Sequence, residues 1–485
     1  MRLFFITILC FQLNFSSSFS QNDSIDSFIK TQMNAKKIPA LQLAIIRNGE
    51  IVKTGNYGVT NQENGSLVNS NTVFALNSIT KAFTGVAVMQ LVEEGKLDIN
   101  KPVSTYLENL PESWRAISVK QLLNHTSGIP NIMDYNTNLL SKNNEKESWD
   151  MVQELPMDFE PGEKFRYNQT NYLLIGKIIN KVSGMPFSDF IQKRQLEKIG
   201  ANRTLEAGFT HYEDMLPNAV IGYVYSREGE LVSVDEIFTP SLRTAAGMSS
   251  TATELARWII SLQKGELLDN EDSLKSLWKP GKLNNGDIGG FNRLLNGYAL
   301  GFPIIKREEH PVVAPVGGGR SAMFIYPKDD LSIIVLTNLL GASPDSFIDE
   351  IAGFYIPEMK LKNGFGLPKN IKNLRSQLEI KGYNNALEIY KHLKVENQNF
   401  ELLENDINHW GYTLLKLKEN NKALEIFKLN IALFPTSANA YDSLGEMYVV
   451  LEDAKKALKN YRESLRLNPN NKNAKNYIKV LETKI

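Results

Sequence analysis

A serine and a lysine stand three residues apart at the start of a long apolar stretch. Ser78 and Lys81 belong to the segment Phe74-Ala-Leu-Asn-Ser-Ile-Thr-Lys-Ala-Phe-Thr-Gly-Val-Ala-Val-Met-Gln-Leu91. Residues at this spacing share one face of a helix, so the amine can reach the hydroxyl. Burial lowers the pKa of a lysine, which can then hold or relay the proton that a nucleophilic serine must lose. The pattern therefore indicates an activated serine, and the N-terminus of the helix favours negative charge near it.

The Ser-x-x-Lys spacing alone is a weak signal, so its context must decide. It occurs four times, beginning at Ser27, Ser78, Ser261 and Ser276. The alternative interpretation makes the serine a helix N-cap and the lysine a solvated side chain. That alternative suits Ser27 and Ser261, which lie on amphipathic helices, and Ser276, which is followed at once by Lys279 and a proline. Only Ser78 begins an apolar helix.

A tyrosine at a loop–helix junction is the second candidate. Tyr167 stands between a turn at Pro161-Gly162 and an apolar helix that ends near Gly184. A phenol at such a junction can face a cleft and carry protons if a nearby cation stabilises its phenolate. A packed aromatic side chain is the alternative interpretation of an isolated tyrosine.

Together these elements resemble the motifs of class C β-lactamases, D-aminopeptidases and related esterases, which are penicillin-recognising serine hydrolases. The resemblance covers roughly residues 25 to 345, in the family's order. It includes the stretches Glu93-Glu-Gly-Lys-Leu-Asp98, Leu122-Leu-Asn-His-Thr-Ser-Gly-Ile-Pro130, Pro161-Gly-Glu-Lys-Phe-Arg-Tyr167, Gly247-Met-Ser-Ser-Thr-Ala252 and Tyr298-Ala-Leu-Gly301. The resemblance implies that Ser78 is the acylated nucleophile, Lys81 its proton-relay partner and Tyr167 the base. The N–H of Ser78 would form half of the oxyanion hole.

The second motif departs from the family's pattern in one residue. The family usually has Tyr-x-Asn, whereas this chain has Tyr167-Asn168-Gln169. The amide of Gln169 can still donate and accept hydrogen bonds, from one carbon further out. We therefore expect Gln169 to contact the substrate, with Asn168 as a residue that could share this work.

The third motif departs further, because it loses its cation. The family has Lys-Thr-Gly or His-x-Gly on a strand, and this chain has Pro315-Val-Gly-Gly318 in that register. The second oxyanion-hole N–H then belongs to Gly318, or to Gly319 if the register slips by one residue. Arg320 or His310 could replace the cation. Loss of the family's lysine or histidine removes a partner for the carboxylate of β-lactams and of peptide C-termini, which favours an esterase or peptidase.

The elements that position these residues come from both ends and the middle of one domain. Leu41–Ile46 and Glu50–Gly55 alternate around an Asn-Gly turn, which predicts a β-hairpin. Ala322–Tyr326 and Leu331–Thr337 predict a second pair of strands, and the middle is mostly helical. We predict a domain of α/β architecture over residues 21–365, and the resemblance implies that it is a β-lactamase-like serine hydrolase domain. The resemblance implies an antiparallel sheet flanked by helices, together with a helical region.

Residues 370–485 show an internal repeat with a period of 34, as from Gly411 to Gly445. Matching offsets carry Ala423 and Ala457, Phe427 and Tyr461, and Pro435 and Pro469. This is the tetratricopeptide pattern, in which small residues let two helices approach and aromatic side chains fill the gap. We predict an all-α tetratricopeptide repeat domain, with a generic helical tail as the alternative.

The N-terminus and the overall composition limit the setting. Residues 1–20 have the layout of a secretory signal peptide, with an apolar run too short to span a bilayer. We expect a periplasmic or secreted protein with no membrane span after signal removal. Lysine plus arginine and aspartate plus glutamate both number 54, so no nucleic-acid partner is predicted. The histidines lack metal-ligand spacing, and we predict no metal and no cofactor.

Two functions follow from these residues. The first is a serine hydrolase that acts through an acyl-enzyme on an ester, amide or lactam carbonyl of a small molecule or peptide. The second is a catalytically weak penicillin-binding-like protein that binds a peptide or protein, or associates with itself, through its repeats. We favour the enzyme because both Ser78 and Lys81 are present.

Overall fold

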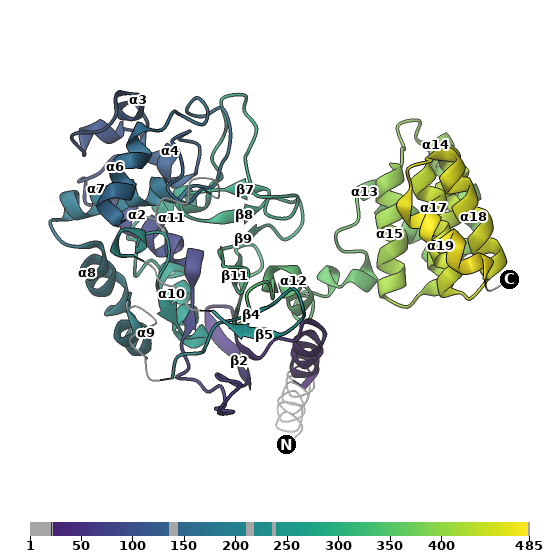
Figure 1. Ribbon diagram of the computed structural model, residues 1–485, viewed down its shortest axis with the longest axis horizontal. Coiled ribbons are helices and arrows are strands. Elements are labelled where there is room, and N and C mark those ends of the chain that lie inside the picture. The colour runs from purple at the N-terminus through teal and green to yellow at the C-terminus, as the bar shows by residue number, and fades with distance from the viewer. Residues whose placement is uncertain (1–20, 22, 135–143, 210–217, 235–238, 484–485) are drawn as a thin grey trace, which may run out of the picture. The chain divides into compact units, whose positions relative to one another are not determined.

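The computed structural model describes residues 21, 23–134, 144–209, 218–234 and 239–483. The chain divides into two compact units, the first ending at Ile351 and the second running from Ala352 to Ile485 (Figure 1). This boundary lies ahead of residue 365, where the sequence predicts the end of the hydrolase domain. Residues 362 and 363 are tied to the second unit, because Arg375 donates hydrogen bonds to both of their carbonyls. The predicted signal peptide lies outside the described residues.

The first unit is built around an antiparallel sheet, as predicted. Its strand order is β2-β1-β12-β11-β9-β8-β7, with β10 paired to β11. The strands are β1 (Ala40–Arg47), β2 (Glu50–Gly58), β7 (Gly297–Tyr298), β8 (Pro303–Ile305), β9 (Val312–Val313), β10 (Val316–Gly317), β11 (Ser321–Tyr326) and β12 (Leu331–Thr337). The two predicted strand pairs are confirmed, and β1 joins them by pairing with β12 from Leu41↔Thr337 to Arg47↔Leu331.

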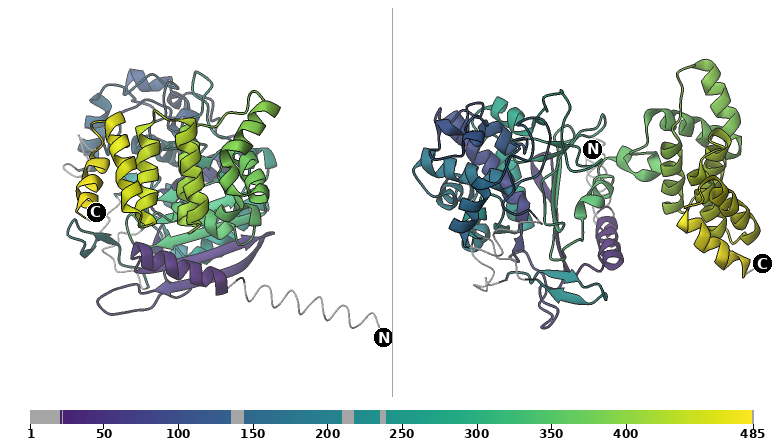
Figure 2. Two further views of the ribbon diagram at one scale, coloured as in Figure 1. Left: turned by 90° about the vertical axis from the view of Figure 1, so that its right-hand side faces the viewer. Right: turned by 45° about the horizontal axis from the view of Figure 1, so that its top comes forward.

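Helices cover both faces of this sheet. The central strands β1, β11 and β12 are buried along nearly their whole length, so side chains that point to either face are apolar. Helix α10 (Ala252–Gln263) packs on one face. The other face is covered by a helix over residues 23–36 and by α12 (Ile348–Ala352), where the rings of Phe28 and Phe347 meet edge to face (Figure 2).

The chain between β2 and β7 supplies the helical region. Its centre is α2 (Thr80–Glu93), in which residues 80–91 are all buried. The other helices are α3 (Glu112–Arg115), α4 (Val119–Leu123), α6 (Glu145–Glu154), α7 (Gln169–Ser183), α8 (Phe187–Ile191), α9 (Asn202–Ala207) and α11 (Glu271–Trp278). Short strand pairs connect them, β3 (Phe74–Ala75) with β6 (Ser249–Ser250) and β4 (Tyr223–Tyr225) with β5 (Leu231–Ser233). Within the described ranges, no helix has the length and apolar character needed to cross a membrane.

The second unit is all-helical around its own apolar core. Its helices are α13 (Lys369–Lys381), α14 (Ala386–Glu396), α15 (Glu404–Lys416), α16 (Asn420–Leu433), α17 (Ala438–Val450), α18 (Ala454–Leu467) and α19 (Lys472–Glu482). The two repeated glycines face the two repeated aromatic residues. A Cβ atom on Gly411 would lie 2.6 Å from the ring of Phe427, and one on Gly445 would lie 3.1 Å from the ring of Tyr461. The helices of each pair are therefore as close as the repeat pattern predicts.

Candidate active site

Ser78 lies in a tight turn between a short strand and the central helix. After β3, the N–H of Leu76 donates to the Met248 carbonyl at 2.8 Å, and the 3₁₀ turn Asn77–Ile79 then leads into α2. Asn77 has a φ of 48°, in the left-handed region that asparagine tolerates better than most residues. Ser78 is partly exposed whereas both of its neighbours are buried. The turn therefore presents the serine hydroxyl at the edge of the core.

Lys81 lies one helical turn further along and is fully buried. Its Nζ atom is 3.5 Å from Ser78 Oγ and donates to the Ala245 carbonyl at 2.9 Å. Burial lowers the pKa of Lys81 well below its ordinary value, because a charged amine would be poorly solvated there. A neutral amine next to the serine hydroxyl can accept its proton.

The Tyr167 hydroxyl donates to Ser78 Oγ at 2.8 Å, so the three predicted reactive residues converge. The Nζ atom of Lys81 lies 4.7 Å from the centre of the Tyr167 ring. Burial raises the pKa of Tyr167, and hydrogen bonds with Ser78 and Gln169 offset only part of that effect. The phenol is therefore protonated at neutral pH, whereas the expected base would be a phenolate.

His125 holds the loop that carries Tyr167. It is fully buried, its Nδ1 accepts from the Asn168 N–H at 3.2 Å, and its carbonyl accepts from the Arg166 N–H at 3.0 Å. Its ring centre is 4.5 Å from that of Tyr167. Burial lowers the pKa of His125 well below its ordinary value, so the imidazole is neutral. His125 thus fixes the position of Tyr167 on both the backbone and the ring.

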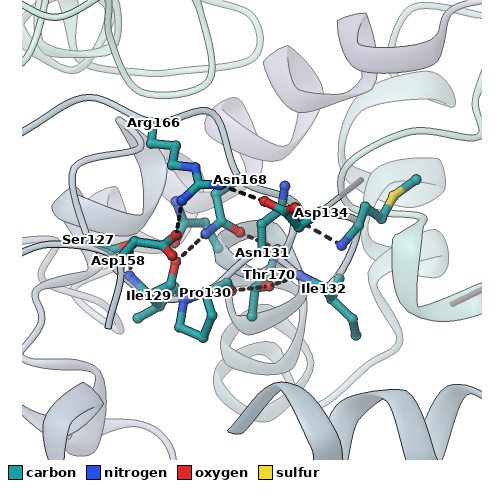
Figure 3. Close-up of polar contacts among 12 residues, drawn as sticks. Ser127, Ile129, Pro130, Asn131, Ile132, Asp134, Asp158, Arg166, Asn168 and Thr170 are labelled. Carbon is teal, nitrogen blue, oxygen red and sulfur yellow. Dashed lines mark hydrogen bonds and ion pairs between the residues drawn. The ribbon is translucent and has the colours of Figure 1, made fainter. Parts of the chain in front are cut away.

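A polar network fastens the Tyr167 segment to the loop over residues 127–134 (Figure 3). Arg166 forms ion pairs with Asp134 at 2.5 Å and with Asp158 at 2.8 Å. Thr170 Oγ1 donates to the Pro130 carbonyl at 2.8 Å. These contacts fix the residues on both sides of Tyr167 and so restrict the position of its side chain.

The structure separates the two candidate amides. The Oδ1 atom of Asn168 caps α7 by accepting from the Thr170 N–H at 2.7 Å, and its Nδ2 donates to the Ile129 carbonyl at 2.5 Å. With its side chain buried and both polar atoms engaged, Asn168 does not fit the expected share in substrate binding. Gln169 is partly exposed and contacts the Tyr167 phenol. Its Oε1 atom has no hydrogen-bond partner among the described residues.

The third motif forms a tight hairpin against the nucleophile turn. Gly317, at the end of β10, approaches that turn so closely that a Cβ atom would lie 2.0 Å from the Leu76 carbonyl oxygen. The same atom would lie 3.1 Å from the backbone nitrogen of Ser78. Only glycine fits here, and the hairpin backbone therefore lies directly beside the N–H of Ser78.

The orientation of this hairpin distinguishes the two candidate oxyanion donors. The Gly317 carbonyl accepts from the Arg320 N–H at 3.0 Å, inside the hairpin. The N–H of Gly318 belongs to the same trans peptide and points the opposite way, out of the hairpin. The Gly319 carbonyl accepts from the Ser343 N–H at 2.8 Å, which ties the hairpin to the loop beyond β12. The orientation of the Gly317–Gly318 peptide agrees with Gly318 as the second oxyanion donor, and the role of Gly319 stays a prediction.

Neither expected substitute for the missing cation is presented to a substrate. His310 Nδ1 lies 2.8 Å from the Asp329 carboxylate, beyond the far end of β11. Six strand residues separate that end from the hairpin, which corresponds to about 20 Å. Arg320 is 3% exposed, and its guanidinium is packed against Gly222. The position of Pro315 therefore has no cationic replacement from these two residues.

Sequence reasoning missed two groups at the site. The Ala245 carbonyl, which accepts from Lys81, is a backbone atom and leaves no signal in residue types. Phe291 lies outside the family motifs, yet its ring centre is 4.9 Å from that of Tyr167 and its side chain is 40% exposed. The preceding Gly289-Gly290 pair was the signal available in the sequence, because paired glycines often allow two backbones to approach closely.

The sequence of this chain is similar to those of known proteins. The family model described as Beta-lactamase matches residues 25–354. Protein flp of Staphylococcus aureus (strain MRSA252) is 30% identical over 331 residues, which are 66% of this chain and 64% of that protein. Penicillin-binding protein 4* of Bacillus subtilis (strain 168) is 27% identical over 308 residues, 60% of this chain and 66% of that protein. The chain thus spans about two thirds of the length of these curated relatives.

Solved structures show the same fold. The octameric penicillin-binding protein homologue from Pyrococcus abyssi has a TM-score of 0.60 at 25% identity, over 73% of this chain and 81% of that one. The D-amino acid amidase from Ochrobactrum anthropi SV3 has a TM-score of 0.59 at 20% identity, over 70% and 99%. The family match over most of the chain, together with this shared architecture, establishes that the chain belongs to the beta-lactamase family.

Proposed function

We propose that the chain is a serine hydrolase that transfers an acyl group first to Ser78 and then to water. The observation that carries the proposal is the convergence of Ser78, Lys81 and Tyr167, with Ser78 Oγ 2.8 Å from the phenol and 3.5 Å from the amine. Ser78 is partly exposed, so a carbonyl carbon can approach its hydroxyl. The names of the structural neighbours include an amidase and a hydrolase, which agrees with acyl transfer.

We assign the first step to Lys81, because its Nζ atom lies 3.5 Å from Ser78 Oγ and burial lowers its pKa. Its neutral amine takes the proton from Ser78 Oγ as the oxygen attacks the carbonyl carbon. The resulting oxyanion is stabilised by the N–H groups of Ser78 and Gly318. Tyr167 then gives its proton to the leaving group as the scissile bond breaks, and the ammonium of Lys81 restores it. This assignment differs from the expectation that Tyr167 acts as the base.

The second step uses water as the nucleophile. Lys81, again neutral, accepts a proton from water as the water oxygen attacks the acyl carbon, and the Lys81 ammonium returns that proton to Ser78 Oγ as the ester bond breaks. We propose that the side chain of Gln169 borders the acyl group, because it is partly exposed and contacts the Tyr167 phenol, which touches the nucleophile. Without a cation at Pro315, esters and amides that lack a carboxylate are favoured over β-lactams.

We also propose that the second unit is a tetratricopeptide repeat array. The support is the close packing of Gly411 on Phe427 and of Gly445 on Tyr461, repeated at the period of the sequence pattern. Such an array could bind a protein partner or a second copy of the chain. Export to the periplasm or the medium is proposed from residues 1–20 of the sequence alone.

Fluorophosphonate labelling tests the proposed function. The folded protein should be labelled on Ser78, as located by peptide mass spectrometry, and Ser78→Ala should abolish both labelling and ester hydrolysis. Ser276→Ala is the matched control, since Ser276 begins another Ser-x-x-Lys segment but is exposed on α11. Acyl esters, D-amino-acid amides and nitrocefin should then be compared as substrates. Absence of labelling in folded protein at every pH up to 10 would contradict the proposal.

A further inference from the structure

An exposed aromatic side chain adjoins the proposed proton donor. Phe291 lies on the loop between α11 and β7, and its ring centre is 4.9 Å from Tyr167, 5.6 Å from Phe165 and 5.9 Å from Tyr298. Tyr298 is buried, whereas Phe291 is 40% exposed. One edge of Phe291 therefore completes an aromatic cluster, and the rest of the ring is open to a ligand.

The loop that carries Phe291 is fixed by its own hydrogen bonds. The Phe291 N–H donates to the Leu295 carbonyl at 2.8 Å, and the Asn292 side chain accepts from the Leu295 N–H at 2.9 Å. A Cβ atom on Gly289 would lie 2.2 Å from the Cβ of Phe165, so the glycine lets the loop lie directly on the Tyr167 segment. An exposed apolar ring held in this way is preorganised for contact, because little conformational entropy is lost on binding.

The loop is also fastened to the turn that precedes Tyr167. The Asn284 N–H donates to the Gly162 carbonyl at 2.9 Å, and the Asn284 side chain donates to the Pro161 carbonyl at 3.1 Å. These bonds hold the start of the loop against the Tyr167 segment. A group bound beside the Tyr167 side chain is within reach of the Phe291 ring, whose centre lies 4.9 Å from the centre of the Tyr167 ring.

We propose that Phe291 forms the leaving-group subsite and selects substrates whose leaving group is aromatic and uncharged. The inference rests on the proposed function, because it takes Tyr167 as the donor to the leaving group. An aromatic group can pack on Phe291 at the separation that aromatic pairs prefer. The nearby cation Arg166 is engaged by Asp134 and Asp158, and Pro315 supplies no charge. A carboxylate on the leaving group therefore gains no fixed partner from these residues.

Three acetate esters test this selectivity in the full-length protein. Phenyl acetate, trifluoroethyl acetate and 4-carboxyphenyl acetate share one acyl group, and acid release measures kcat/KM for each. Phe291→Ala should lower kcat/KM for phenyl acetate about tenfold and for trifluoroethyl acetate less than twofold, the order expected for one lost aromatic contact. Because the intrinsic reactivity of each ester is the same toward every variant, the change in the phenyl-to-trifluoroethyl ratio isolates the contact.

Two further variants complete the design. Phe291→Leu keeps an apolar side chain on the loop, and should lower the ratio in the same direction even if the alanine variant is unstable. Arg293→Ala changes an exposed residue of the same loop and should leave the ratio unchanged. In the wild type, 4-carboxyphenyl acetate should be hydrolysed no faster than phenyl acetate.

The outcomes separate this inference from the proposed function. Failure of a fluorophosphonate to label wild-type Ser78 would remove the proposed function, and the inference with it. Labelling combined with equal losses for both uncharged esters in Phe291→Ala would overturn the inference alone, since it would mean that Phe291 only supports Tyr167. A preference for the carboxylated ester that disappears in Arg293→Ala would overturn it too, because the loop would then recognise charge.

Discussion

Replacing Lys81 with methionine tests the assignment of the proton acceptor. Methionine has a similar length and no charge, so it can occupy the same buried space. The variant should lose acylation, because no neutral amine would stand 3.5 Å from Ser78 Oγ. Loss of such a base lowers turnover about 10²- to 10⁴-fold. The same change should alter stability in a pH-dependent manner, which activity measurements alone would not reveal.

The stability effect has two opposing parts. Methionine leaves the Ala245 carbonyl without its donor, which costs about 1–3 kcal/mol at any pH. It also removes an amine that is charged in the unfolded chain, whereas burial in the folded chain disfavours its charged form. Because the folded pKa of Lys81 lies below the ordinary value of 10.5, the unfolded wild type binds one more proton than the folded wild type in the window between the two. Wild-type stability therefore rises by about 1.4 kcal/mol per pH unit in that window.

The free energy of unfolding of Lys81→Met, relative to that of the wild type, should accordingly fall by about 1.4 kcal/mol per pH unit as pH rises toward 10.5. Urea unfolding followed by tryptophan fluorescence reports on the first unit, which holds four of the five tryptophans. Subtracting wild-type from variant free energies at pH 7, 8, 9 and 10 cancels the other titrating groups. A difference that stays constant over this range would show that Lys81 is charged in the folded protein, and would refute the assignment.

Three further predictions follow from the same structure. Tyr167→Phe removes the hydroxyl bonded to Ser78, and should lower kcat/KM for esters about 10²-fold or more while reducing fluorophosphonate labelling less, since fluoride leaves without a proton. Gly317→Ala would force a methyl group against the Leu76 carbonyl, so labelling should fail and the melting temperature of the first unit should drop. Gly411→Ala overpacks a helix pair of the second unit, and should destabilise that unit by about 1–3 kcal/mol in urea unfolding without changing ester hydrolysis.

The elements that the sequence predicted correctly are those with strong local patterns. The hairpin of β1 and β2 and the pair β11 and β12 follow from alternation and turn residues, which act over a few positions. The proximity of Ser78 and Lys81 follows from helical spacing in the same way. Tyr167 is 89 residues from Ser78, and only the family resemblance placed the two together.

The groups that sequence reasoning misjudged or missed depend on local competition for hydrogen bonds or on distant backbone. Asn168 carries an amide, but a cap position at the start of α7 uses it first, because a helix N-terminus needs acceptors for its free N–H groups. The acceptor of the Lys81 amine is the backbone of Ala245, 164 residues away, which residue types do not reveal. Phe291 reaches Tyr167 through a loop whose path is set by Asn284 and by glycines.

The absence of a cation at Pro315 and the protonation of the Tyr167 phenol are physically linked. A Tyr167 phenolate would be stable only beside a cation, because an unpaired charge is costly in a poorly solvated site. Here burial lowers the pKa of Lys81 and raises that of Tyr167, and β10 offers no second cation, so the site favours the uncharged amine and the protonated phenol. Charge then develops only when the oxyanion forms and the Lys81 ammonium stands beside it. Activity should therefore fall as pH decreases through the folded-state pKa of Lys81, and should not require ionisation of Tyr167.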